Sequence, residues 1–298
     1  IIAKKATYGL DLWANYGDAF VPANDYGKET MFVSDHSKDP KYGYYTVGGG
    51  ASGGGAQNLT PWFTNWNYPN LGVNSFKNAA GNLTNNGTST MIRDSYYGRP
   101  YIRIRPNSYK WPSGPNAGKS YFLDQAFVNR TVDSRFENTF YTVWIANKET
   151  SNAQNAANNS RGIPTYTLRA NIDTAIWMPD YEVQGAPQFV GTRPFKGTVI
   201  PPSLWNNTYF PSVKKFMDPS RGANFNDPSS RPVVIYRFAD VYLTGAEAAF
   251  KAGQATLAKD LLNAIRRRAA FRSSNTADQN AAAATAMEIK EADVTLDF

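Results

Sequence analysis

The segment from residue 232 to residue 271 limits the possible folds of this chain more than any other feature. Apolar side chains recur at helical spacing over residues 239–250 and again over residues 255–269. Gly253 lies between the two runs, where a left-handed C-cap commonly ends a helix. The segment therefore predicts two amphipathic helices joined by a glycine turn. Such a pair cannot bury both of its apolar faces alone, so it must pack against further structure.

The predicted helix pair fills about 34 residues, which is the length of a tetratricopeptide (TPR) repeat. Upstream, runs that are β-branched, aromatic or alternating predict short strands, and they lie at 30–33, 101–105, 140–145, 165–169 and 174–178. Long irregular stretches at 46–90, 147–163 and 211–232 accompany them, and loops of such length are usually functional or disordered. We expect a mainly α fold in which TPR-type helix pairs pack against a loop-rich half with short β-strands.

The expected organisation is a single domain made of two regions. Residues 1–232 form the loop-rich region that carries the ligand, and residues 233–298 form the C-terminal helix pair and the start of a further helix. The first residues, Ile1 to Ala6, are typical of the end of a helix. Ala281–Ala284 is interpreted as a linker before the final helix.

Composition excludes several classes of function. The 298-residue chain has no cysteine, which removes disulfides, thiolate catalysis and thiolate metal sites. Its net charge is +7, but the main basic cluster, Arg266–Arg268, lies near a predicted helix C-terminus, where the helix dipole favours cations. A nucleic-acid binder would spread its charge along a stripe, so we expect no nucleic-acid partner. The charge excess would also suit an anionic glycan.

Aromatic residues make up 14% of the chain and charged residues only 18%, a balance common in secreted proteins and sugar binders. Sugar recognition needs flat apolar faces for the ring and amide or carboxylate groups for the hydroxyls. Residues 61–70 supply both, because Trp62 and Trp66 alternate with asparagines. A spacing of four puts the two indoles on one side of a helix or a strand. They therefore predict a stacking platform; alternatively, they pack the loop onto the body.

A second group follows at Arg93–Tyr97, where an arginine and an aspartate adjoin two tyrosines, and Trp111 lies in a further turn. These side chains can stack on a sugar or bond its hydroxyls, or they can anchor their own turns. The full set of predicted ligand-binding residues is Trp62, Asn65, Trp66, Asn67, Tyr68, Arg93, Asp94, Tyr96 and Trp111.

Catalytic motifs are lacking. The single histidine, His36, has no triad pattern, no His-Glu-x-x-His zinc motif occurs, and no Gly-Lys-Ser/Thr follows the glycine triplets. A paired-carboxylate glycosidase stays open, because its two acids can be far apart in sequence; the candidates Asp94, Asp124 and Asp133 have no motif. We expect no enzyme activity and no cofactor. A structural Ca²⁺ at residues 24–27 or 224–227 stays open, although neither has a regular oxygen spacing.

An ordered series of motifs covers nearly the whole chain. The helix pair carries Ile235–Leu243, Ala246–Ala248 and Leu262–Ala269. Upstream lie Gly98–Pro106, Asp133–Phe136, Phe140–Trp144, Asp173–Trp177 and Pro211–Phe216. In this order the motifs resemble those of the SusD/RagB family, whose members are surface lipoproteins of the Bacteroidetes outer membrane. Those proteins capture glycans, or in some members peptides, and pass them to a SusC-like TonB-dependent transporter.

The resemblance implies a SusD-like fold and a non-catalytic role in capturing oligosaccharides at the outer membrane, with a SusC-like transporter as partner. Peptide binding, as in the RagB branch, glycan hydrolysis and a purely structural role beside the transporter are the alternatives. Family members begin with a signal peptide, a lipid-bearing cysteine and several TPR helices. This chain shows none of these, so we expect it to be a large C-terminal part of such a protein, anchored through an N-terminal lipid outside this sequence.

Overall fold

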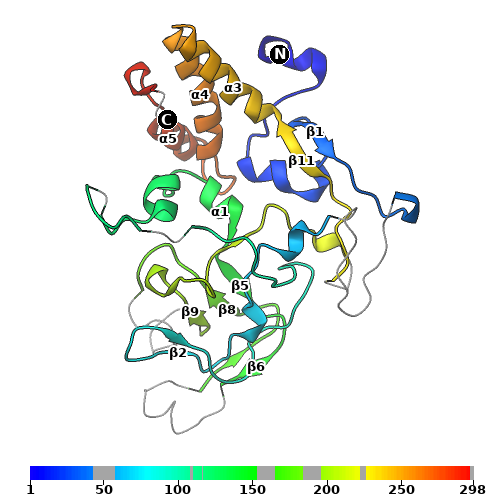
Figure 1. Cartoon of the computed structure of the whole chain (residues 1–298), viewed down its shortest axis with the longest axis vertical. Coiled ribbons are helices and arrows are strands. Elements are labelled where there is room, and N and C mark those ends of the chain that lie inside the picture. The colour runs from blue at the N-terminus through cyan, green and yellow to red at the C-terminus, as the bar shows by residue number, and fades with distance from the viewer. Residues whose placement is uncertain are drawn as a thin grey trace.

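The computed structural model describes residues 1–42, 58–107, 110–115, 117–152, 165–183, 196–221 and 226–295. The molecule is elongated in Figure 1, with the C-terminal helices and the N-terminal segment at one end and most of the short strands towards the other. Part of the predicted loop at 46–90 and most of the one at 147–163 lie outside the described residues.

The helical end confirms the predicted helix pair. Helix α3 (Phe238–Lys251) packs on α4 (Ala255–Ala270), and α4 packs on α5 (Ala277–Met287). Gly253 joins α3 to α4 with φ +75°, a left-handed conformation that costs glycine little. Helix is concentrated in these C-terminal elements, so the description of the chain as mainly α fits this end and not the rest. The TPR-type geometry of the pair stays a prediction.

The interpretation of Ala281–Ala284 as a linker is wrong, because these alanines lie inside α5. The Thr276 side chain accepts a hydrogen bond from the Gln279 backbone, and the Gln279 side chain accepts one from the Thr276 backbone, so a capping box begins the helix. Alanine has the highest intrinsic helix propensity. Buried Met287 then packs against Ala269 and Ala270 of α4, which fixes the helix in place.

The N-terminal segment crosses to the helical end through a two-stranded ribbon. Strand β1 (Thr30–Ser34) pairs antiparallel with β11 (Val233–Arg237), which leads directly into α3. Before β1 the chain forms 3-10 turns at Ile2–Tyr8, Tyr16–Phe20 and Pro22–Asn24. The ribbon joins the two regions that the sequence divides at residue 232.

The other end contains several small sheets. Strand β8 (Thr174–Trp177) lies between antiparallel β5 (Val143–Ile145) and parallel β9 (Thr198–Val199). Two-stranded antiparallel pairs are β2 (Phe76–Lys77) with β3 (Leu83–Thr84), β4 (Phe140–Tyr141) with β10 (Ser212–Val213), and β6 (Thr150–Ser151) with β7 (Thr167–Leu168). The short helix α1 (Arg135–Thr139) precedes β4. The predicted strands at 30–33, 140–145, 165–169 and 174–178 are thus confirmed in whole or in part.

The strand predicted at 101–105 is wrong. Ile102 has φ +53°, which a strand does not allow. Its backbone N–H donates to the Asn65 carbonyl at 3.1 Å, and the N–H groups of the next two residues both donate to the Phe63 carbonyl at 2.9 Å. The segment therefore bonds through its backbone to residues 62–65 and does not pair with another strand.

Candidate functional site

The two tryptophans predicted as a sugar platform are buried. Trp62 is 3% exposed and Trp66 is 0% exposed, so neither indole can stack on a ligand, and the predicted platform is wrong. Trp66 packs edge-on against Trp144 at 5.7 Å and Tyr209 at 5.5 Å between ring centroids. The guanidinium of Arg99 lies over the Trp62 ring, 4.6 Å from its centroid. The open alternative, that the segment packs onto the body, is the one that the structure shows.

Two further predicted ligand residues, Tyr68 and Asn65, belong to the same core, and their assignment as ligand groups is wrong for the same reason. Both are 0% exposed. The Tyr68 hydroxyl donates to the Gly98 carbonyl at 3.0 Å, and Asn65 Nδ2 donates to the Tyr97 carbonyl. Burial raises the pKa of Tyr68 above its ordinary value. These bonds fix the 61–70 segment beneath the turn at Gly98.

Other predicted residues are closer to the surface but have structural contacts. Asp94 accepts hydrogen bonds from the Tyr97 backbone at 2.8 Å and from Asn147 Nδ2 at 2.6 Å, so it caps its own turn. Trp111 stacks on Tyr121, with ring centroids 4.4 Å apart. Asn67 is half-buried and Arg93 is exposed. A role for these four residues in ligand binding stays a prediction.

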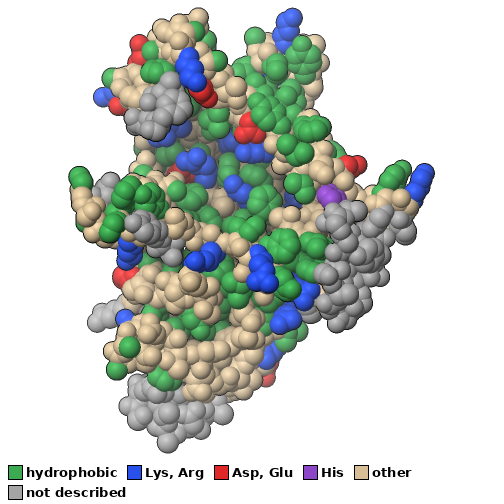
Figure 2. Space-filling view, in the orientation of Figure 1, with side chains coloured by type: hydrophobic (Ala, Val, Ile, Leu, Met, Phe, Trp, Pro, Cys, Tyr) green, Lys and Arg blue, Asp and Glu red, His purple; other side chains and the backbone are tan. Residues whose placement is uncertain are grey.

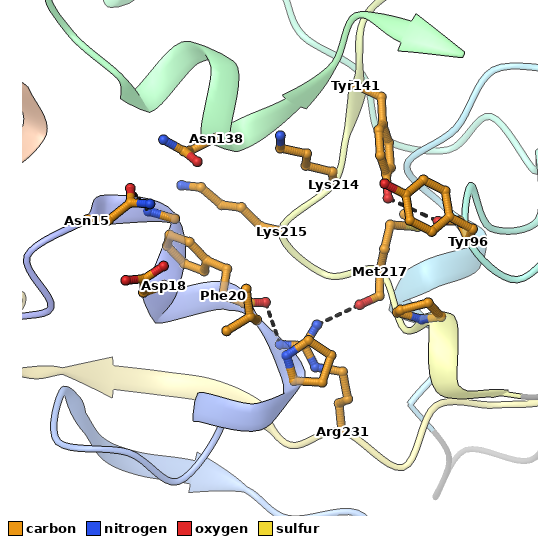
Figure 3. Close-up of a pocket in the computed structure, with 14 residues that line it drawn as sticks. Asn15, Asp18, Phe20, Tyr96, Asn138, Tyr141, Lys214, Lys215, Met217 and Arg231 are labelled. Atoms are coloured by element: carbon orange, nitrogen blue, oxygen red, sulfur yellow. Dashed lines mark hydrogen bonds between the residues drawn. The ribbon is translucent and has the colours of Figure 1, made fainter. Parts of the chain in front are cut away.

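Tyr96, another predicted ligand residue, lines a pocket. The pocket has a volume of about 300 Å³ and is bounded by the 3-10 turn at Tyr16–Phe20, α1, β4 and the segment after β10 (Figure 3). Gly17 allows the turn to approach α1 closely, because a Cβ there would lie 2.3 Å from Asn138 Oδ1. The lining side chains that matter for ligand chemistry are polar or aromatic; they are Asn15, Asp18, Phe20, Tyr96, Asn138, Tyr141, Lys214, Lys215 and Arg231.

One wall of the pocket is a rigid arginine. Arg231 donates from Nε and Nη2 to the two carboxylate oxygens of Asp25, at 2.9 and 2.6 Å. It also donates to the backbone carbonyls of Met217 and Phe20, at 2.5 and 2.8 Å (Figure 3). Because both Asp25 oxygens bind this guanidinium, they are committed to a structural ion pair. This argues against the Ca²⁺ considered at residues 24–27; part of the second candidate, 224–227, lies outside the described residues.

The aromatic side of the pocket is formed by two tyrosines. Tyr96 is 53% exposed, and its ring meets Tyr97 edge-on at 4.9 Å. The Tyr141 hydroxyl donates to the Tyr96 carbonyl at 3.0 Å, which holds the pair together (Figure 3). Burial raises the pKa of Tyr141, so its phenol stays neutral. An exposed ring on a fixed backbone suits stacking against the C–H face of a sugar.

The side of the pocket opposite the tyrosines carries Lys214 and Lys215. In the sequence they are noted only within the family motif at Pro211–Phe216 and are not predicted as ligand residues. In Figure 3 Lys214 and Lys215 extend towards Asn138 and away from the two tyrosines. Burial lowers the pKa of both ammonium groups. Lys215 Nζ donates to the Tyr16 hydroxyl and lies 4.7 and 4.4 Å from the ring centroids of Tyr16 and Phe20. The adjacent lysine pair is visible in the sequence, but nothing there shows that it faces a pocket.

The surface around this site is mixed. Figure 2 shows several Lys and Arg side chains across the middle of the molecule, next to apolar side chains. A second pocket of about 360 Å³ shares Phe20, Lys215 and Arg231 with the first. These three residues therefore border both pockets.

The carboxylates considered for catalysis have no arrangement suited to it. Asp133 forms a two-point ion pair with Arg135, with contacts of 2.6 and 3.0 Å, and Asp94 caps a turn as described above. Among the described residues lining the pocket in Figure 3, Asp18 is the only acid. No group of three His, Asp or Glu side chains within the described ranges could hold a metal ion. The absence of enzyme activity and of a cofactor stays a prediction.

The structure combines packed C-terminal helices with a loop-rich part that contains small sheets and lines the pocket. The sequence model of the SusD family matches residues 29–292, so the chain belongs to the SusD family. The resemblance stated from the motifs is therefore confirmed, and family membership indicates a nutrient-binding protein of the outer membrane. No curated protein sequence matches the chain. No helix in the described parts of the chain has the length and apolar character needed to cross a bilayer.

Proposed function

We propose that the protein captures oligosaccharides at the cell surface and delivers them to a SusC-like TonB-dependent transporter. It would act as an outer-membrane lipoprotein without catalysis. In this proposal the helical end, with TPR-type packing, faces the transporter. The observation that carries the proposal is the pocket in Figure 3, which an exposed tyrosine ring lines on one side and amide and ammonium groups line on the other.

The chemistry of the pocket supports a sugar. Tyr96 provides an exposed aromatic face, and Asn15 and Asn138 provide amides for hydroxyl groups. Asn15 Oδ1 accepts from the Gly17 backbone at 3.1 Å, whereas its Nδ2 donates to no described residue. Hydroxyls exchange water bonds for protein bonds at little net gain, so each contact contributes modestly and the affinity should be moderate. Asn67, Arg93 and Trp111 are proposed as outer contacts for longer chains.

Replacing Tyr96 with alanine should weaken oligosaccharide binding about five- to tenfold, because an aromatic ring buries a large area and stacks specifically. Calorimetry with a panel of plant and host oligosaccharides would measure the affinity. Tyr8→Ala is the matched control, because Tyr8 is similarly exposed and lies outside the pocket. Equal affinities for wild-type protein and Tyr96→Ala would refute the assignment of this pocket.

The alternatives give different outcomes in the same assay. A glycosidase needs two carboxylates about 5–10 Å apart, and the single acid of the pocket argues against one. Product analysis after incubation with the panel tests this directly. Tight binding of peptides but of no glycan would support a RagB-like role. Association with the transporter without affinity for either would support a structural role.

A further inference from the structure

Two ammonium groups in the Figure 3 pocket have no carboxylate partner among the residues that the structure describes. Arg231, the third cation, is neutralised by both oxygens of Asp25. The Lys214 ammonium group has no hydrogen bond or ion pair with any residue that the structure describes. Lys215 is held by the Tyr16 hydroxyl and by two aromatic rings, none of which carries a formal charge. Two half-buried positive charges therefore face the pocket without a counter-charge of their own.

The acids near these lysines do not fill that role. Glu137 favours the charged form of Lys214, but its carboxylate pairs with Arg272 at 2.9 Å. Asp18 lines the same pocket and forms no ion pair with a described residue, so it reduces the positive field without removing it. Arg135 and Arg237 oppose the charge on Lys215; Arg135 pairs with Asp133, and Arg237 pairs with Glu29, which Arg268 shares.

A charged, half-buried ammonium group such as that of Lys214 or Lys215 is unfavourable unless an anion binds next to it. A buried charge without a partner costs free energy, and burial lowers the pKa of both lysines, as expected for that cost. Lys215 has compensating contacts with Tyr16 and Phe20. The Lys214 ammonium has no such close contact among the described residues, and the attraction of Glu137 does not outweigh the cost of its burial. A cost of this kind is typical of functional sites.

We infer that this pocket takes an acidic sugar, with its carboxylate between Lys214 and Lys215 and its ring against Tyr96. The inference rests on the proposed function and names the class of its cargo. The tyrosine face and the Asn15 amide favour a saccharide over a peptide, because a sugar ring can stack on the first and bond its hydroxyls to the second within the same pocket. The two lysine ammonium groups would then bind a uronate more tightly than the neutral sugar of the same shape, because only the uronate has a carboxylate to pair with them.

The test compares acidic oligosaccharides with their carboxyl-reduced, neutral forms. Tetragalacturonate and an unsulfated chondroitin tetrasaccharide serve as probes, titrated into the whole chain at low salt. We expect at least one acidic probe to bind about tenfold more tightly than its reduced form. Lys214→Met should remove that preference, since a hydrogen bond to a charged group contributes about 1.5–3 kcal/mol, that is, tenfold or more in affinity. Lys214→Arg keeps the charge and should retain most of it.

Controls separate a lost charge from a damaged fold. Lys77→Met removes an exposed lysine outside the pocket and should leave every affinity unchanged. Lys214→Met should leave the melting temperature equal or raise it by about 1–3 °C, because an unpartnered charge is removed. A lower melting temperature with unchanged selectivity would show that Lys214 is structural and would overturn the inference.

The remaining outcomes distinguish this inference from the proposed function. If acidic and neutral probes bind equally and both depend on Tyr96, the proposed function stands and the acidic cargo is wrong. A sulfated neutral galactan that binds through Lys214 in place of the uronates would overturn the carboxylate assignment. Preference for an acidic peptide over every glycan would overturn both, and so would binding of no glycan in the panel.

Discussion

Replacing Glu29 with alanine is expected to lower the free energy of unfolding by about 3–5 kcal/mol, because it leaves buried charges without their partner. Glu29 is 1% exposed. Its carboxylate accepts from Arg237 Nη1 at 3.0 Å and from Arg268 Nη1 at 3.0 and 3.2 Å. The backbone of Trp13 also donates to it, at 3.1 Å. One acid thus joins the N-terminal segment to the first residue before α3 and to the end of α4.

Urea unfolding followed by tryptophan fluorescence would measure the change. Glu247→Ala is the control: Glu247 pairs with Lys251 on the exposed face of α3, and surface pairs of this kind contribute at most about 0.5 kcal/mol. If the free energy of unfolding of Glu29→Ala were within about 1 kcal/mol of the wild-type value, the prediction would be wrong, and Arg237 and Arg268 would have other partners or water in the variant.

Trp66→Ala is expected to destabilise the protein by about 3–5 kcal/mol, the range for removing a large aromatic side chain from a core. Trp66 is fully buried against Trp144 and Tyr209. Where the variant is still folded, its affinity for oligosaccharides should be within about twofold of wild type, because the ring is outside any ligand's reach.

Phe32→Ala is the control variant for this measurement, because Phe32 is an exposed aromatic residue on β1. Its replacement should lower the free energy of unfolding by less than about 1 kcal/mol. Thermal unfolding and calorimetry on the same samples separate stability from binding. A tenfold loss of glycan affinity in Trp66→Ala with little loss of stability would restore the stacking platform that the burial of the ring rejects.

Sequence reasoning works best here where the signal is local. The stripes of α3 and α4 and the glycine between them depend only on neighbours along the chain, and the structure confirms them. The alanine run at 281–284 contains equally local information, since alanine favours helix, and the linker interpretation overlooks it. The capping box at Thr276 is the signal that could have corrected this.

The site depends on contacts between distant parts of the chain, and there the sequence misleads. Alternating tryptophan and asparagine look the same whether the rings face solvent or a core. Trp66 is buried because Trp144 and Tyr209, which are distant in the sequence, pack against it. Likewise, Lys214 and Lys215 face a pocket only because the turn at Tyr16–Phe20, about 200 residues earlier, folds against them. Composition predicts a class of ligand chemistry, which stays a prediction, and it cannot place the surface that would carry the ligand.

The carboxylate of Glu29 also has a consequence for how the protein is made. It lies 239 residues before Arg268, one of its two arginines. Ribosomes add roughly 5–20 residues per second, so this acid waits on the order of 10–50 s for that guanidinium to be synthesised. During that interval the Glu29 carboxylate cannot be buried as it is in the native structure, because Arg268 has not yet been synthesised. Native closure of the molecule is therefore a late event in translation, and chains that stop short of α4 should be preferred targets for proteases.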